Sequence, residues 1–132
     1  MSSRVNFVAF ANIGAAIISA ANTNRDGTGT LVQVLVAPSA GSGRAGGSRI
    51  ERIRVCALGT TTDGMVRLFL DNGTARWLYD EIGVEALVPS AVIKAFRKEI
   101  ECKDLVLPAG WTLKASTHNA ESFAVLALGG DF

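Results

Sequence analysis

The sequence predicts a mainly β protein: one domain over residues 1–132, an antiparallel β-sandwich of the jelly-roll type with eight or nine short strands. Three observations lead to this prediction. Most apolar stretches are short and bounded by turn residues, which is typical of strands. Apolar and polar residues alternate with a period of two between residues 49 and 84. The chain also has no internal repeat, and a sandwich is the simplest fold that covers the edges of so many strands.

The N-terminal third contains three of the expected strands. Residues 5–10 and 13–20 form two apolar stretches with a two-residue break between them, and residues 31–37 are dense in β-branched residues. The segments 22–30 and 38–48 are rich in Gly and polar residues, so ordering them would cost much conformational entropy. We therefore expect both segments to be flexible loops.

The middle of the chain shows the clearest alternation. In the strand expected at 49–58, Ile53 and Val55 lie on one face, and Arg52 and Arg54 lie on the other. The next two strands, 65–70 and 75–84, flank Asp71-Asn72-Gly73, a favourable tight turn. The last of these strands would place Trp77 and Tyr79 on one face and Leu78 and Ile82 on the other. Together the three strands predict an antiparallel meander.

Residues 90–103 are compatible with two structures. Val92, Phe96 and Ile100 are four residues apart, and Ser90 is available as an N-cap, which suits a short helix. As a strand, the same segment would place Phe96, Ile100 and Cys102 on one face. Beyond it, we expect residues 111–117 and 122–128 to pair as a hairpin.

The charge distribution limits the choice of partners. The chain is 48% hydrophobic and 19% charged, with a net charge of +1 and no basic cluster, so we do not expect it to bind nucleic acid. No run of 18 uninterrupted apolar residues is present, so no membrane-spanning helix is expected. Charge is sparse in residues 1–24 and 105–132. We expect these segments to be buried centrally or against another chain, which favours an oligomer.

Nothing in the sequence indicates an enzyme, a metal site or a cofactor. His118 is the only histidine, and Cys56 and Cys102 lack the spacing of metal ligands. The segment 41–46 matches GxGxxG, but the residues after it alternate as a strand, whereas a dinucleotide site requires a helix there. We therefore expect no small-molecule substrate.

Three aromatic residues leave one alternative open. Trp77, Tyr79 and Trp111 are expected in strands, where aromatic side chains usually belong to the core. Exposed in a groove, the same side chains would form a platform on which sugars or bases stack. This arrangement would favour a carbohydrate-binding module.

Three segments carry a resemblance to a known family: NTNRDGTGT (22–30), SRIERIRVCALGTTTDGMVRLFLDNG (48–73) and LVLPAGWTLKASTHNAESFAVLALGGDF (105–132). On these segments the chain resembles small virion structural proteins of tailed bacteriophages. The resemblance implies a non-enzymatic protein, and it favours the strand over the helix at 90–103. From the size and β-character of such proteins we expect a capsid decoration or cement protein. A tail or fibre component is the alternative.

The expected partner is the major capsid protein, bound by a homotrimer on the capsid surface of the virion after synthesis in the cytoplasm of the host bacterium. The symmetry of an icosahedral lattice favours trimeric partners at three-fold positions. We expect the contact to involve the apolar N-terminal residues, with the arginine-bearing strand as the other candidate surface. The expected interface residues are Val5, Phe7, Val8, Phe10, Ile17, Ile18, Arg52 and Arg54.

Overall fold

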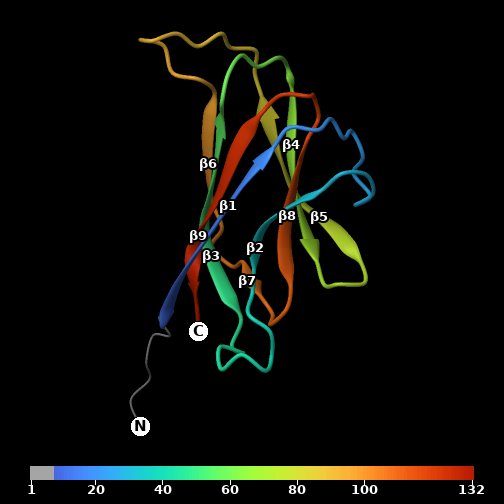
Figure 1. Ribbon diagram of the computed structural model, residues 1–132, viewed down its shortest axis with the longest axis vertical. Coiled ribbons are helices and arrows are strands. Elements are labelled where there is room, and N and C mark those ends of the chain that lie inside the picture. Colours follow the sequence, from blue (N-terminus) through green and yellow to red (C-terminus); the bar gives the residue numbers. More distant parts are fainter. Residues whose placement is uncertain (1–7) are drawn as a thin grey trace.

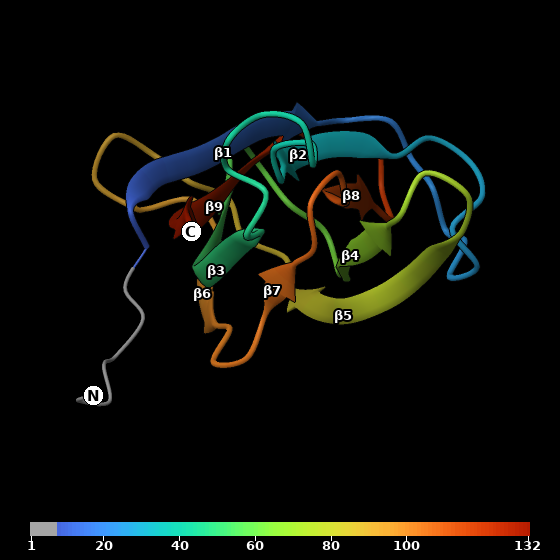
Figure 2. The same cartoon turned by 90° about the horizontal axis from the view of Figure 1, so that it is seen from below.

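The structure is a computed structural model that describes residues 8–132. These residues form two antiparallel sheets that face one another (Figures 1 and 2). Sheet A has the strand order β1-β9-β3-β6, and a short strand, β7, pairs with β3. Sheet B has the order β2-β8-β4-β5. The all-β prediction is therefore confirmed.

For β2 to β5, β8 and β9, the strand bounds agree closely with the segments expected from the sequence. The strands of sheet A are β1 (Phe10–Ile18), β3 (Ser48–Ala57), β6 (Arg97–Glu101), β7 (Val106–Leu107) and β9 (Phe123–Asp131). The strands of sheet B are β2 (Val32–Val36), β4 (Gly64–Asp71), β5 (Arg76–Val84) and β8 (Thr112–Thr117). Residues 8–132 contain no helix long and apolar enough to cross a membrane.

The strand pairings are nested. β4 pairs with β5, β3 pairs with β6 and β7, β2 pairs with β8, and β1 pairs with β9. The chain thus resembles one long hairpin whose tip is the β4–β5 turn. Strands that pair across this hairpin belong to the same sheet, whereas most successive strands belong to different sheets. The folded hairpin therefore encloses one interior between the two sheets.

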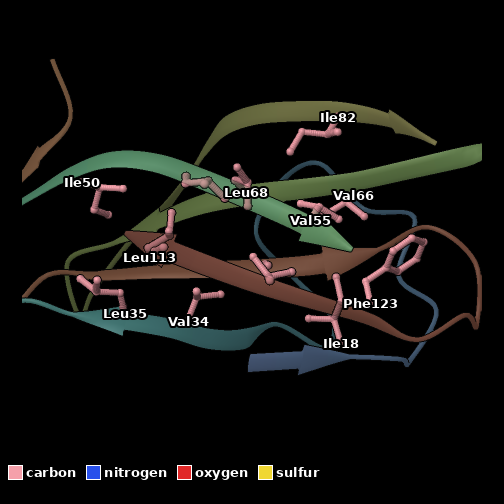
Figure 3. Packing of buried hydrophobic residues seen from close by; sticks show 14 of the residues in the cluster. Ile18, Val34, Leu35, Ile50, Val55, Val66, Leu68, Ile82, Leu113 and Phe123 are labelled. Atoms are coloured by element: carbon pink, nitrogen blue, oxygen red, sulfur yellow. The ribbon is translucent and has the colours of Figure 1, made fainter. Parts of the chain in front are cut away.

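The core lies between the two sheets. It is filled by side chains from both sheets, which come from every second position along the strands, as expected for a sandwich (Figure 3). The completely buried members include Ile50, Ile53, Val55, Val66, Leu68, Leu113 and Val125. At one end, the ring of Phe96 meets the ring of Phe123 edge-on, at 6.5 Å between centroids.

Two of the predicted pairings are wrong. Residues 111–117 and 122–128 form β8 and β9, but β8 lies in sheet B and β9 in sheet A, so they are not a hairpin. Likewise β3 and β4 lie in different sheets, so the meander is reduced to the β4–β5 hairpin. The connections cross from one sheet to the other, a separation of about 10 Å. Alternation determines which side chains face inward, but it does not identify the neighbouring strand.

The β4–β5 turn confirms the prediction made from Asp71-Asn72-Gly73. The Asp71 carboxylate accepts the N–H of Gly73, and the Asn72 side chain accepts the N–H groups of Thr74 and Ala75. Gly73 has a φ of 94°, a conformation that glycine adopts without steric cost. The side chains of the turn therefore satisfy backbone donors that the strand ladder cannot.

The N-terminal stretch differs from the prediction of two strands. The predicted break at residues 11–12 lies inside the continuous strand β1. Asn12 is accommodated in the strand because its side-chain amide donates to the Asp131 carboxylate at 2.9 Å and to the Val36 carbonyl at 3.3 Å. The expected interface residues Val5 and Phe7 lie outside the described residues.

The segment 90–103 contains the strand β6 and no helix, so the helical alternative is wrong. Ser90 makes the expected capping contacts, since its hydroxyl accepts the N–H groups of Val92 and Ile93. Ser90 and Ile93 then close a turn through two backbone hydrogen bonds, instead of starting a helix. β6 pairs with β3, and this pairing keeps Phe96 and Cys102 in the core.

A β-bulge changes the predicted faces of β5. In the register with β4, Asp80 lies opposite Leu68 and Leu78 opposite Phe69, so Tyr79 is an extra residue. Trp77 and Ile82 consequently share a face, because their partners in β4 are four residues apart. The predicted separation of these two residues is wrong, since strict alternation does not survive a bulge.

Candidate partner-binding surface

The outward side of β1 and β9 is apolar. The strand register places Ile13 opposite Leu128, Ala15 opposite Leu126, and Ile17 opposite Ala124. Ile13 is 65% exposed and Ile17 is 61% exposed. We call these six residues the apolar surface. Full burial of a large aliphatic side chain contributes about 1.5–3 kcal/mol, and most of this contribution is not realised at Ile13 and Ile17 in the described chain.

The same face of sheet A becomes charged toward β6. Arg52 lies opposite Leu128, and Arg54 lies opposite Leu126, so each row of the register runs from apolar to charged residues. Arg54 donates from Nε and Nη2 to Oε2 of Glu99, at 2.9 and 2.7 Å, and Arg52 Nη1 lies 3.5 Å from Oε1. We call Arg52, Arg54 and Glu99 the charged strip.

The charged strip is ionised and accessible. The hydrogen bond from Arg54 holds the pKa of Glu99 below its ordinary value. Solvent-exposed ion pairs of this kind contribute little to stability, because water screens them. The strip therefore contributes little to the stability of the fold, and the ion pairs to Glu99 hold its arginines beside the apolar surface.

The Gly-rich segment 38–48 contacts the ends of β1 and β9 on the other side of sheet A, since Phe10 and Asp131 point away from the apolar surface. The Arg44 guanidinium lies over the ring of Phe10, 4.0 Å from its centroid. Its Nη1 also lies 3.8 Å from Oδ2 of Asp131, which is buried and accepts hydrogen bonds from Ser48 and Asn12. A single side chain thus links this segment to both β1 and β9.

The structure brings together some of the expected interface residues and separates others. Ile17, Arg52 and Arg54 share the outward face of sheet A, so the two candidate surfaces of the sequence analysis are parts of one face. Val8 is half-buried beside Gly130, and Phe10 is exposed. Ile18 is only 1% exposed and belongs to the core, so it is not available to a partner.

Five of the six residues of the apolar surface were not predicted from the sequence, namely Ile13, Ala15, Ala124, Leu126 and Leu128. The sparse charge of both terminal segments was the signal, because these segments form β1 and β9, which lie side by side. β9 is central in sheet A, as expected for an uncharged segment. β1 is an edge strand whose outward side chains are covered by nothing within the described chain.

Among residues 8–132, no three His, Cys, Asp or Glu side chains are grouped so as to hold a metal ion. Cys56 and Cys102 are free thiols. Burial raises the pKa of Cys102 and, together with a hydrogen bond between the two groups, raises the pKa of Tyr79 to about 12. Cys102 thus has little thiolate character.

The Trp77 ring, 48% exposed, stacks on the ring of Trp111 at 5.7 Å between centroids and an interplanar angle of 16°. One face of the Trp77 ring is therefore covered by the Trp111 side chain.

The comparisons with known proteins provide no family: the chain matches no protein-family profile and no curated protein.

Proposed function

We propose that this chain is a non-enzymatic virion structural protein that binds the assembled coat of a tailed bacteriophage and reinforces the capsid exterior. The apolar surface carries this proposal. It is a row of exposed aliphatic side chains with no cover in the described chain, and it lies directly beside accessible arginines. An apolar patch with a charged rim is typical of a surface that binds another protein.

We infer that the sandwich is of the jelly-roll type. The nested strand pairings and the orders β1-β9-β3-β6 and β2-β8-β4-β5 support this assignment. Eight-stranded double sheets of this type occur in viral capsid and lectin domains. A fold alone does not determine function, so the assignment is compatible with the proposal and does not carry it.

Reinforcement requires that the protein bridge neighbouring coat subunits. A homotrimer at a three-fold position does this, because symmetry lets every protomer present the same face to an equivalent coat subunit. Separating two coat subunits then requires breaking these contacts as well. The major capsid protein is the proposed partner, and the capsid surface is the proposed location.

The second candidate is a carbohydrate-binding module on a tail or fibre. The observation that favours it is the exposure of Trp77, whose ring offers a free face for stacking against a sugar. Against it, Trp111 occupies the other face, so the pair provides one stacking surface instead of a groove.

A reattachment experiment tests the leading proposal. Virions stripped of this protein are mixed with the purified chain, and bound protein is measured by sedimentation. We expect the double variant Ile13→Asp/Ile17→Asp to bind at least ten-fold more weakly, because two exposed aliphatic contacts are lost.

Val92→Asp is the control, since Val92 is 93% exposed, lies outside the strands and belongs to neither the apolar surface nor the charged strip. Circular dichroism establishes that each variant is folded. Equal binding of the double variant and the control would overturn the proposed surface. Failure of the unmodified chain to bind virions, combined with binding to host polysaccharide that Trp77→Ala abolishes, would support the second candidate.

A further inference from the structure

A cleft of about 820 Å³ opens where the outward side of sheet B meets the start of β6. Met65 of β4 and Gly83 of β5, which are paired in the register, contribute to its lining. Lys98 enters from β6, where it lies opposite Val55, on the inward side of this edge strand. The cleft shares none of its lining residues with the apolar surface or the charged strip.

A buried arginine forms the back of this cleft. Arg67 is 1% exposed, although it occupies an outward position of β4. Its Nε donates to Oε2 of Glu81 at 2.8 Å, but the same oxygen also accepts from Nε of Arg25 at 2.7 Å. Two guanidinium groups thus share one carboxylate. The cluster therefore retains one excess positive charge, and burial of the Arg67 guanidinium makes an unpaired charge there costly.

His118 adds a directed donor. Its Nδ1 lies 3.2 Å from Nη1 of Arg67. A guanidinium can only donate, so Nδ1 must be the acceptor of this hydrogen bond, and the ring proton must reside on Nε2. Within residues 8–132, Nε2 has no hydrogen-bond partner. The Arg67 contact therefore fixes a tautomer that leaves one N–H free at the wall of the cleft.

The charges of the lining favour a small anion. Four cationic side chains line the cleft, namely Arg25, Arg67, Arg97 and Lys98. Against them stand the carboxylates of Asp63 and Glu85 and the Glu81 carboxylate that Arg25 and Arg67 share, which leaves an excess of one positive charge. Asp63 is already engaged, because its Oδ1 accepts the N–H of Ala86 at 3.0 Å. The excess is modest, which suits a monoanionic carboxylate. A nucleic-acid backbone requires a longer basic track than these side chains provide.

From these contacts we propose that the cleft binds the carboxylate of a glutamate or aspartate side chain presented by an acidic polypeptide segment. His118 Nε2 donates one hydrogen bond, Lys98 supplies a charge from the edge of β6, and the buried Arg67 supplies a fixed positive field from behind. This site goes beyond the proposed coat-binding face, and it does not depend on where the protein resides.

Nuclear magnetic resonance on the full ¹⁵N-labelled chain tests the proposal. The chain is titrated at low ionic strength with acetyl-Glu-Glu-Glu-amide and with its glutamine counterpart. We expect saturable shifts of the Gly64 and Gly83 amides and of the His118 ring with the glutamate peptide only. Lys98→Gln should weaken binding about two- to five-fold, within the range for an exposed charge contact.

Lys103→Gln is the matched control, because it removes the same charge from an exposed position that does not line this cleft. Equal shifts with the glutamine peptide, or unchanged affinity in Lys98→Gln, would overturn the proposal. Sodium phosphate is titrated as well. If phosphate binds the same residues more tightly than the peptide does, the carboxylate assignment is wrong.

Discussion

The two outward faces of the sandwich differ sharply. On sheet B, Phe69 is completely buried although it is not part of the core between the sheets. The segment from Asn22 to Gly27 crosses this face: the Asn22 and Gly27 carbonyls accept hydrogen bonds from Arg67 and Arg76. On sheet A, the apolar surface has no such cover in the described chain.

The difference indicates how the chain distributes its apolar residues. Asn22 organises the covering segment, since its side-chain amide donates to the carbonyls of Thr28 and Thr30. The chain thus uses its own residues to bury the outward side of sheet B. The exposed aliphatic residues on sheet A do not stabilise the free chain in this way, because nothing in the described chain buries them. We therefore propose that a partner buries them.

The largest expected effect compares a buried and an exposed apolar residue. Phe69→Ala should lower the free energy of unfolding by about 3–4 kcal/mol, because it removes a fully buried ring. Ile13→Ala should change it by less than about 0.5 kcal/mol in the free chain. Urea denaturation of both variants provides the comparison. Similar losses for the two would show that sheet A is covered in solution.

The next effect concerns the contact between the two edge strands β1 and β2. A Cβ atom at Gly14 would lie 2.2 Å from the Val34 carbonyl oxygen, so Gly14→Ala forces β1 away from β2. We expect a loss of about 1–3 kcal/mol, the usual cost of overpacking. Gly83→Ala is the matched strand control, because no atom lies within 4 Å of its added Cβ. Thermal unfolding of both variants measures the difference, and equal midpoints would contradict the close approach.

The sequence predicted the strands better than their partners. The alternation around Ile53 and Val55 correctly identified the inward face of β3. The prediction of which strands pair failed, because strands alternate with a period of two whether they are joined by a hairpin or by a connection between sheets. The candidate surface was predicted in part for a related reason. Ile17 and Ile18 are adjacent in an uninterrupted apolar run, so the sequence cannot tell which one faces outward.

A smaller effect concerns the pH dependence of stability, which should depend on Asp71 of sheet B more than on Glu99 of sheet A. Lys114, the Gly73 N–H and Arg76 hold the pKa of Asp71 at about 2. This value lies below that of the unfolded chain, so the stabilisation is complete above about pH 5 and is lost as the pH falls toward 2. We expect Asp71 to account for about 1–2 kcal/mol of this loss.

Asp71→Asn should flatten the acid limb of a plot of unfolding free energy against pH. Glu99→Gln, on the exposed charged strip, should leave that limb nearly unchanged, because its ion pairs are screened by solvent. A larger change for Glu99→Gln than for Asp71→Asn would contradict the contrast between the faces.

The smallest expected effect concerns the contribution of the charged strip to attachment of the protein to virions. Replacing both Arg52 and Arg54 by Gln should weaken attachment to virions by less than about ten-fold, since exposed pairs contribute about 0.2–1 kcal/mol each. Attachment should also survive washing in roughly molar sodium chloride, where the screening length is about 3 Å and apolar burial is undiminished. Release at moderate salt would show instead that charge dominates the contact.

Protection of the apolar surface on the intact particle tests the central claim most directly. In a Cys56→Ser background, Ala15→Cys places a thiol on the apolar surface, and Ala91→Cys places one on an exposed loop elsewhere. Maleimide labelling rates are measured for the free and the virion-bound protein. The account predicts that binding slows labelling at position 15 at least ten-fold and leaves position 91 unchanged. Equal rates at position 15 in both states, or protection of position 91 instead, would contradict it.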